Sequence, residues 1–260
     1  MTDSPDILLV DVTDRVAVVT LNRPERRNAF TWDLVQRLGD TMRALDADVD
    51  VDVIILTGAD PAFCAGVDLK EAGSDGGVFA HAHELPARGL FDDTEKPVIG
   101  AINGATATGG LELALTCDFL IASENARFAD THSRVGVQPG GGVTVRLARW
   151  IGLPRAKQMS ITGNYLDAET ALAWGLVNEV VPHDELLVRC RQIAADIVGN
   201  DQRGLRQILR TYDLGAATTE EHAWEIERAV SFQWFVAGVD PAEVEARRAG
   251  VVERGRSQQS

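Results

Sequence analysis

The sequence predicts an α/β core followed by a helical C-terminal region. Through about residue 181, strand-like apolar runs alternate with segments of helical spacing, and helices dominate from about residue 167 onward. This order is typical of an α/β core with a helical appendage. The 260 residues are 45% hydrophobic and 25% charged, which is enough apolar material to close a sizeable core. We place that core at residues 1–200 and the C-terminal helical region at residues 201–260.

The first predicted elements are a hairpin and a helix. Two β-rich runs at 7–12 and 16–21 are separated by a short polar segment and predict a β-hairpin. Thr31 is placed to cap a helix, because its hydroxyl can accept an N–H of the first helical turn. Apolar residues with helical spacing follow it, at Leu34, Val35, Leu38, Met42 and Leu45.

Strands and helices alternate through the middle of the chain. The continuous apolar runs 53–57 and 97–102 are typical of buried strands, and a long irregular stretch begins at residue 59. Gly109 and Gly110 open an apolar helix that extends to about residue 116. Further strands are expected at 118–123, 127–129 and 177–181, and further helices through Leu147 and Trp150, at 168–174, 185–198, 205–212 and 219–235, and from Pro241.

Composition excludes several functional classes. The chain has 39 acidic and 25 basic residues, a net charge of −14 and no basic block, so a general nucleic-acid binder is not expected. Its start is acidic, and no run approaches the roughly 20 apolar residues of a membrane span. Cys64, Cys117 and Cys190 are far apart and indicate no disulfide framework. We expect a cytoplasmic protein with free thiols and no membrane partner.

The glycine-rich segments do not match the common nucleotide-binding or hydrolase motifs. Gly104 and Gly109 have the spacing of a phosphate-binding loop, but Gly110-Leu111 stands where that loop needs Lys and then Ser or Thr. No G-x-G-x-x-G follows a strand, and no G-x-S-x-G nucleophile elbow occurs. One segment remains to be explained. It consists of a strand, a turn, two glycines and a helix with Glu112 in its first turn.

That remaining segment has the parts of a catalytic site. The N–H groups at the start of a helix lack intrahelical partners, and a glycine there lets a ligand approach the backbone. Glu112 follows Gly109 by three residues, so a backbone donor and a carboxylate base can face one reacting group. Gly66 permits an unusual backbone angle that would present the N–H of Val67. The alternative is that these glycines serve packing, that Glu112 interacts with the helix dipole, and that a helix starts at Val67.

Taken together, these segments resemble the crotonase family, the enoyl-CoA hydratase/isomerase superfamily. The resemblance covers nearly the whole chain, in family order, and is much more specific for family and fold than for reaction. Its segments are 21–29 (LNRPERRNA), 63–71 (FCAGVDLKE), 96–104 (KPVIGAING), 109–114 (GGLELA), 117–118 (CD), 139–142 (PGGG) and 171–178 (ALAWGLVN). It implies a crotonase-type spiral of β-β-α units with a C-terminal helical region used in trimerisation.

The resemblance also implies an active site. Two backbone N–H groups, at Val67 and Gly109, would hold the thioester oxygen, and Glu112 matches the first of two hydratase carboxylates. His132 stands where the second carboxylate is expected, and it either shares the proton transfers with Glu112 or marks a protein that no longer hydrates. Asp130 is a possible substitute carboxylate, since an extended segment would put it on the same face as His132.

Other residues have weaker assignments. Coenzyme A carries phosphates that need cations, and Arg26 lies in a local basic group with Arg23 and Arg27. Candidate substrate-binding residues are Arg26, Ala65, Gly66, Val67, Asp68, Leu69, Lys70 and Gly109. Cys64 and Cys117 are expected to pack in the core, and His81 and His83 to lie on a solvated face.

The expected activity is hydration of a trans-2-enoyl-CoA to a 3-hydroxyacyl-CoA, a step of fatty acid metabolism, by a homotrimer or a dimer of trimers. No metal or redox cofactor is expected, because coenzyme A is part of the substrate. The alternatives are another crotonase-family isomerase or lyase of CoA thioesters, or a non-catalytic acyl-CoA-binding protein. The acyl chain length is left open.

Overall fold

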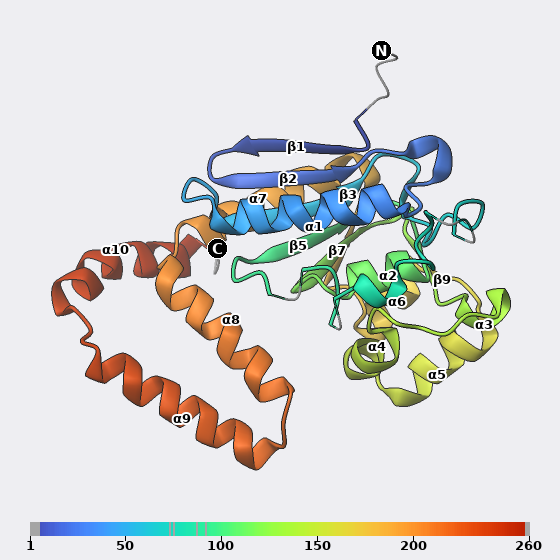
Figure 1. Ribbon diagram of the computed structural model, residues 1–260. Helices are drawn as coiled ribbons and strands as arrows, with labels where there is room; N and C mark the ends of the chain where they lie inside the picture. The colour runs from blue at the N-terminus through green and yellow to red at the C-terminus, as the bar shows by residue number, and fades with distance from the viewer. Residues whose placement is uncertain (1–5, 73, 75, 87, 92, 258–260) are drawn as a thin grey trace. The chain divides into compact units, whose positions relative to one another are not determined.

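The computed structural model describes residues 6–72, 74, 76–86, 88–91 and 93–257 (Figure 1). The chain divides into two compact units, Met1–Gln202 and Arg203–Ser260. The first unit contains both β-sheets and most of the helices, and the second contains helices alone.

A six-stranded sheet forms the centre of the first unit. Its strand order is β1-β2-β3-β5-β7-β10. The strands are β1 (Leu8–Thr13), β2 (Val16–Leu21), β3 (Val53–Gly58), β5 (Val98–Ile102), β7 (Phe119–Ser123) and β10 (Glu179–Val181). The first two strands pair antiparallel and the other neighbours pair parallel, so the predicted hairpin and the buried strands are confirmed.

A second, smaller sheet builds the spiral. It has the order β4-β6-β8-β9 and consists of β4 (Ala62–Cys64), β6 (Ala105–Ala107), β8 (Arg127–Ala129) and β9 (Leu166–Asp167). Three times in succession, a strand of the large sheet is followed by a short strand of the small one: β3 by β4, β5 by β6, and β7 by β8. Of the four short strands the sequence predicted β8, at 127–129, and did not predict β4, β6 or β9.

Strands β2, β3, β5 and β7 of the large sheet are buried on both faces, and alternate residues of these strands belong to different cores. Val16 and Val18 of β2 pack with helix α7 (Leu186–Val198), whereas Ala17 and Val19 belong to the larger core that includes helix α1 (Trp32–Ala47). This alternation follows from the period of two along a strand. The continuous apolar runs in the sequence are the consequence of burial on both sides.

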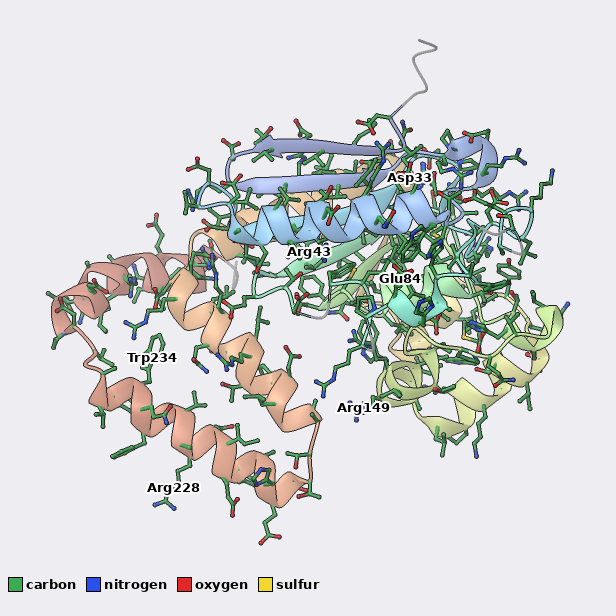
Figure 2. All side chains as sticks on the ribbon, viewed as in Figure 1. Asp33, Arg43, Glu84, Arg149, Arg228 and Trp234 are labelled. Atoms are coloured by element: carbon green, nitrogen blue, oxygen red, sulfur yellow. The ribbon has the colours of Figure 1, made fainter. Side chains whose placement is uncertain are left out.

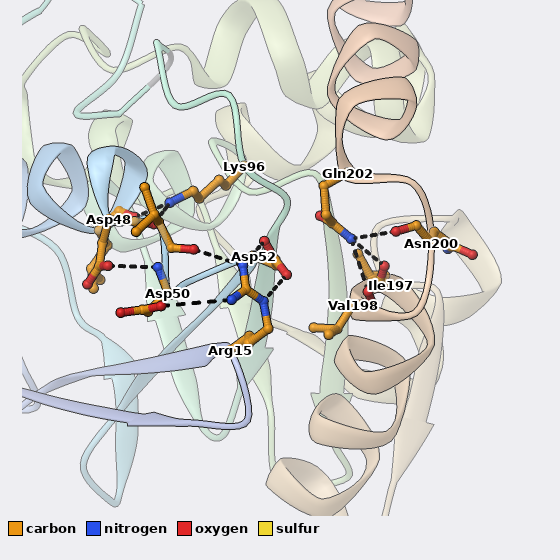
Figure 3. Close-up of polar contacts among 11 residues, drawn as sticks. Arg15, Asp48, Asp50, Asp52, Lys96, Ile197, Val198, Asn200 and Gln202 are labelled. Atoms are coloured by element: carbon orange, nitrogen blue, oxygen red, sulfur yellow. Dashed lines mark hydrogen bonds and ion pairs between the residues drawn. The ribbon is translucent and has the colours of Figure 1, made fainter. Parts of the chain in front are cut away.

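Polar contacts fix the connection between α1 and β3. Thr31 caps α1 as predicted, since its hydroxyl accepts the N–H of Leu34 at 3.2 Å. At the other end, the Lys96 ammonium donates to the carbonyls of Leu45, at 2.6 Å, and Asp48. Arg15 pairs with the buried carboxylate of Asp52, so the turn of the hairpin is tied to the same connection (Figure 3).

The other helices of the first unit are short. They are η1 (Pro24–Arg26), α2 (Gly109–Ala114), η2 (Ala82–Glu84), α3 (His132–Val135), α4 (Val143–Ile151), α5 (Leu153–Thr162), α6 (Ala168–Trp174) and η3 (His183–Glu185). The sequence did not predict α5, whose buried side chains are only Ala156 and Met159. Val67 begins no helix, and instead forms an isolated bridge with Phe30. Gln202 closes the unit by donating to the carbonyls that end α7 (Figure 3).

The second unit consists of α8, which begins at Gln202 and extends to Ala216, α9 (Glu220–Val236) and α10 (Pro241–Ser257). The guanidinium of Arg203 lies over the ring of Trp234, 4.5 Å from its centre, while Arg228 points away from α8 (Figure 2). These three helices contain no buried side chain among the described residues. None of the helices in the described part of the chain is long and apolar enough to cross a membrane.

Candidate active site

A mostly apolar pocket of about 250 Å³ lies in the first unit. Its apolar wall includes Phe30, Val35, Leu85 and Leu90, and its polar residues are Thr108, Glu112, Thr116, Thr131, His132 and Gln138. The loop after β4, the start of α2, the start of α3 and the glycine loop before α4 meet there; α2, α3 and α4 lie on the same side of the large sheet (Figure 1). The fold therefore gathers the segments that the sequence had singled out.

Two backbone N–H groups in this pocket have no protein acceptor among the described residues. Phe30 donates to the carbonyl of Gly66 at 2.7 Å and accepts from Asp68 at 2.8 Å, which leaves the N–H of Val67 between them unpaired. Gly109 is the first residue of α2, so its N–H has no intrahelical partner. Paired amides of this kind can stabilise negative charge on a carbonyl oxygen.

Gly66 brings these two amides together. Its φ is +94°, in the region that favours glycine. A Cβ at Gly66 would lie 2.9 Å from the carbonyl oxygen of Ala107 and 3.3 Å from the nitrogen of Gly109. The loop after β4 therefore approaches the start of α2 closely only because this side chain is absent.

Thr108 fixes the direction of the Gly109 N–H, a role that the sequence pattern does not indicate. It has φ 54° and ψ −112°, an unfavourable conformation for a residue other than glycine. Its N–H donates to Ala129 at 2.9 Å, and its hydroxyl contacts that of Thr131 and accepts the Thr131 N–H at 3.3 Å. Contacts with Ala129 and Thr131 therefore hold Thr108, the residue before the candidate oxyanion donor Gly109.

Glu112 lies one turn into α2 with its two oxygens in different surroundings. Oε1 accepts the N–H of Gly141 at 2.7 Å and is 3.5 Å from that of Val143. Oε2 is 3.8 Å from Nε2 of His132. A Cβ at Gly141 would lie 2.8 Å from Oε2, so the glycine loop both holds the carboxylate and leaves it room.

His132 is bound on its other side by Asp130. The Nδ1 atom of the ring is 2.6 Å from Oδ1 of Asp130, and the backbone N–H of His132 donates to the same oxygen at 3.2 Å. Burial by itself would raise the pKa of Asp130, but hydrogen bonds from the His132 side chain, from Ser160 and from the His132 backbone together outweigh it, so this pKa is lowered. Helix α3 begins at His132, so Asp130 lies behind the histidine and does not share an extended face with it.

The candidate substrate-binding residues separate into two groups. Ala65, Val67, Leu69 and Gly109 line the pocket. The pocket is not lined by the other four candidates, Arg26, Gly66, Asp68 and Lys70. Two of these, Arg26 and Lys70, are exposed. Asp68 forms an ion pair with Arg23 at 3.2 Å and accepts the N–H of Lys70 at the same distance.

The cysteines are buried, as predicted, and the histidines outside the pocket differ from one another. Burial raises the pKa of the Cys64 thiol to about 12 and raises that of Cys117 still further, so neither is a ready thiolate. His83 is exposed, as expected, and the side chain of His81 is partly exposed, at 29%. Its ring stacks on Trp32 with centres 4.7 Å apart, which removes one ring face from solvent.

A serine, a histidine and an aspartate also form a chain outside the pocket. Ser123 Oγ lies 2.9 Å from Nδ1 of His183, whose Nε2 lies 3.1 Å from Oδ2 of Asp60. Ser123 is completely buried, and its hydroxyl already accepts the N–H of Asn125 at 3.0 Å. A substrate cannot reach that hydroxyl, so this series of hydrogen bonds holds strand ends together and is not a nucleophilic site.

A spiral of paired strands and an apolar pocket lined by two unpaired backbone amides are the features of an enzyme of the crotonase fold. The comparisons with known proteins agree with that class. The model of the family described as enoyl-CoA hydratase/isomerase matches residues 11–253. The chain belongs to this family.

Relatives with similar chains are enzymes of this kind by name. The chain is 38% identical to a probable peroxisomal enoyl-CoA hydratase 1 of Arabidopsis thaliana, over 85% of this chain and 83% of that one. It is 35% identical to a crotonyl-CoA hydratase of Syntrophomonas wolfei, over 85% of this chain and 86% of that one.

Solved structures show the same likeness. An enoyl-CoA hydratase from Mycobacterium smegmatis is 50% identical, with a TM-score of 0.74 over 90% of this chain and 100% of that one. An enoyl-CoA hydratase from Bacillus anthracis is 32% identical, with a TM-score of 0.85 over 94% of this chain and 96% of that one. The predicted crotonase fold is confirmed.

Proposed function

We propose that this chain hydrates trans-2-enoyl-CoA thioesters to 3-hydroxyacyl-CoA. The observation that carries the proposal is the placement of Glu112 and His132, 3.8 Å apart, in a pocket that also presents the amides of Val67 and Gly109. The names of the relatives support the same reaction. Their names do not give the acyl chain that this pocket accepts.

The proposed reaction divides the work between backbone and side chains. The N–H groups of Val67 and Gly109 bind the thioester oxygen and stabilise the negative charge that it gains when water adds to the double bond. A water oxygen at ordinary hydrogen-bond distance from both Oε2 of Glu112 and Nε2 of His132 fits their 3.8 Å separation. Glu112 accepts a proton from this water as the oxygen bonds to C3.

His132 completes the proton balance. The electrons of the double bond move toward the thioester oxygen, and C2 then takes a proton from the Glu112–His132 pair. The pair returns to its starting state, so the net change is addition of one water across C2 and C3. His132 thereby performs, as an imidazole, the task for which hydratases of this family use a second carboxylate.

The substrate itself would lie with its acyl chain against the apolar wall and its coenzyme A toward the exposed cations. Arg26 and Lys70 are free to approach phosphates from solvent, whereas the guanidinium of Arg23 already pairs with Asp68. We therefore assign Arg26 and Lys70 to phosphate binding, and residues 65–69 with Gly109 to the thioester end. The reaction requires no metal or redox cofactor, and we place it in the cytoplasm.

We propose that the chain assembles as a homotrimer or a dimer of trimers through its C-terminal helices. In α9, Trp224 is 65% exposed, Phe232 68% and Phe235 69%. Large exposed apolar side chains concentrated in one region are typical of an association surface. Sedimentation at micromolar concentration tests this, and a monomer alone would contradict it.

The activity is tested with crotonyl-CoA and longer trans-2-enoyl-CoA substrates, with products identified by mass spectrometry. The wild type should form 3-hydroxyacyl-CoA, and Glu112→Gln should lose the activity.

The replacement of the second carboxylate by His132 is the one observation that favours a CoA isomerase or lyase. The same screen therefore includes 3-enoyl-CoA and 3-hydroxyacyl-CoA substrates. Tight binding of acyl-CoA without turnover of any of them would reject an enzymatic function.

A further inference from the structure

We propose that Asp130 is a positioning residue that holds His132 in one tautomer, with the proton on Nδ1 and the lone pair of Nε2 toward Glu112. The kinetic part of this inference rests on the proposed hydratase function, whereas the tautomer does not. Asp130 is outside the pocket lining and acts only through the histidine.

Geometry assigns the two ring nitrogens. Nδ1 is 2.6 Å from Oδ1 of Asp130, while Nε2 is 3.8 Å from Oε2 of Glu112. A carboxylate has no proton to donate, so the short contact requires that Nδ1 carries the hydrogen. The neutral ring then has its only acceptor at Nε2, on the side of the pocket.

Both charged groups within ion-pair distance of the ring, among the described residues, are carboxylates. Glu112 faces it from α2, and Asp130 from the end of β8. The side chain of Asp130 is 1% exposed, so water does not screen its charge. The ring therefore has a carboxylate on each side, one at Nδ1 and one toward Nε2.

This arrangement explains how a histidine can stand where a carboxylate is expected. An imidazole without a fixed partner can present either an N–H or a lone pair to the pocket. With Asp130 behind it, His132 presents a lone pair, so it resembles a carboxylate in what it offers to water. Asp130 and His132 together replace the second acid.

A purely structural role for Asp130 makes a different prediction. Oδ1 also accepts the backbone N–H of His132 at 3.2 Å at the start of α3, and an asparagine oxygen can do the same. Asp130→Asn therefore keeps the shape and that backbone contact but removes the charge. Asp60→Asn is the matched control, because Asp60 also contacts a histidine, His183 at 3.1 Å, outside the pocket.

The tautomer is read by solid-state ¹⁵N NMR on protein labelled in histidine, with His132→Gln used to assign the His132 signals. In the wild type near neutral pH, we expect a protonated Nδ1 and an unprotonated Nε2. Asp130→Asn should let both tautomers form, because its amide can donate to Nδ1 as well as accept from it, and Asp60→Asn should leave the ring of His132 unchanged.

The kinetic readout is the pH profile of kcat and KM on an active enoyl-CoA. Asp130→Asn should lower kcat by about 10- to 100-fold, within the range of general acid–base catalysis, with little change in KM. The pH profile of kcat should change because the carboxylate beside Nδ1 is replaced by an amide, and Asp130→Glu should recover part of the rate. Because the residues act as a unit, the Asp130→Asn, His132→Gln double variant should lose no more than His132→Gln alone.

The outcomes separate the two proposals. A wild type that turns over no enoyl-CoA rejects the hydratase function, and the NMR spectra still decide the tautomer. An active wild type whose kcat, pH profile and His132 spectrum are all unaffected by Asp130→Asn overturns the inference. A loss of activity with an unchanged spectrum and an unchanged pH profile also overturns it, because Asp130 would then serve structure alone.

Discussion

Gly66→Ala tests the oxyanion assignment through a single added methyl group. The new Cβ would lie 2.9 Å from the carbonyl oxygen of Ala107 and 3.3 Å from the nitrogen of Gly109, so the loop must move away from α2. An alanine at a φ of +94° also costs about 1–3 kcal/mol of folding stability. The movement separates the N–H of Val67 from that of Gly109, and loss of one such donor lowers kcat by about 10²–10³-fold.

The measurement is kcat for crotonyl-CoA hydration, together with the free energy of unfolding from urea denaturation. Gly76→Ala is the control, because a Cβ at Gly76 meets no heavy atom within 4 Å. It should leave both quantities within experimental error or raise the stability slightly. A folded Gly66→Ala enzyme with wild-type kcat would refute the role of these two amides.

The remaining predictions concern proton transfer, the backbone donors, acid stability and assembly. Glu112→Gln should lower kcat by roughly 10²-fold or more, because the amide cannot accept the proton from water; a wild-type rate in single-turnover experiments would remove Glu112 from the mechanism. Gly109→Pro removes an N–H and should reduce turnover far more than Val67→Ala, which keeps one; equal, mild losses in folded protein would count against both donors. Folding lowers the pKa of Asp130 below its unfolded value of about 4. The ionised carboxylate therefore adds stability above the unfolded pKa. That contribution is lost as the pH falls through the lower, folded pKa. The stability difference between wild type and Asp130→Asn should therefore be constant from about pH 5 to 7 and shrink below about pH 4 in urea titrations; a difference that grows toward low pH would contradict the sign. Trp224→Glu should shift the oligomer toward smaller species in sedimentation, whereas an unchanged profile would place the interface elsewhere.

The sequence determined the family and most of the elements with strong local patterns. The hairpin, α1 with its Thr31 cap and the buried strands of the large sheet all have periodicity or capping residues that act over a few neighbours. The glycine and carboxylate at 109 and 112 were found for the same reason, since three residues on a helix fix their mutual position. Strands β4, β6 and β9 of the small sheet and helix α5 were not predicted, and they form because the tertiary fold pairs or covers them.

The chemistry of the site was decided by contacts between segments far apart in the chain. The sequence placed His132 in the active site, but only the fold shows that Asp130 lies behind it and that Gly141 and Glu112, 29 residues apart, form a hydrogen bond. Nor does the sequence show that Thr108 adopts a conformation typical of glycine, held by Thr131 across 23 residues. Backbone propensities act between neighbours, whereas the tautomer of a histidine and the direction of an N–H depend on whatever the completed fold packs against them.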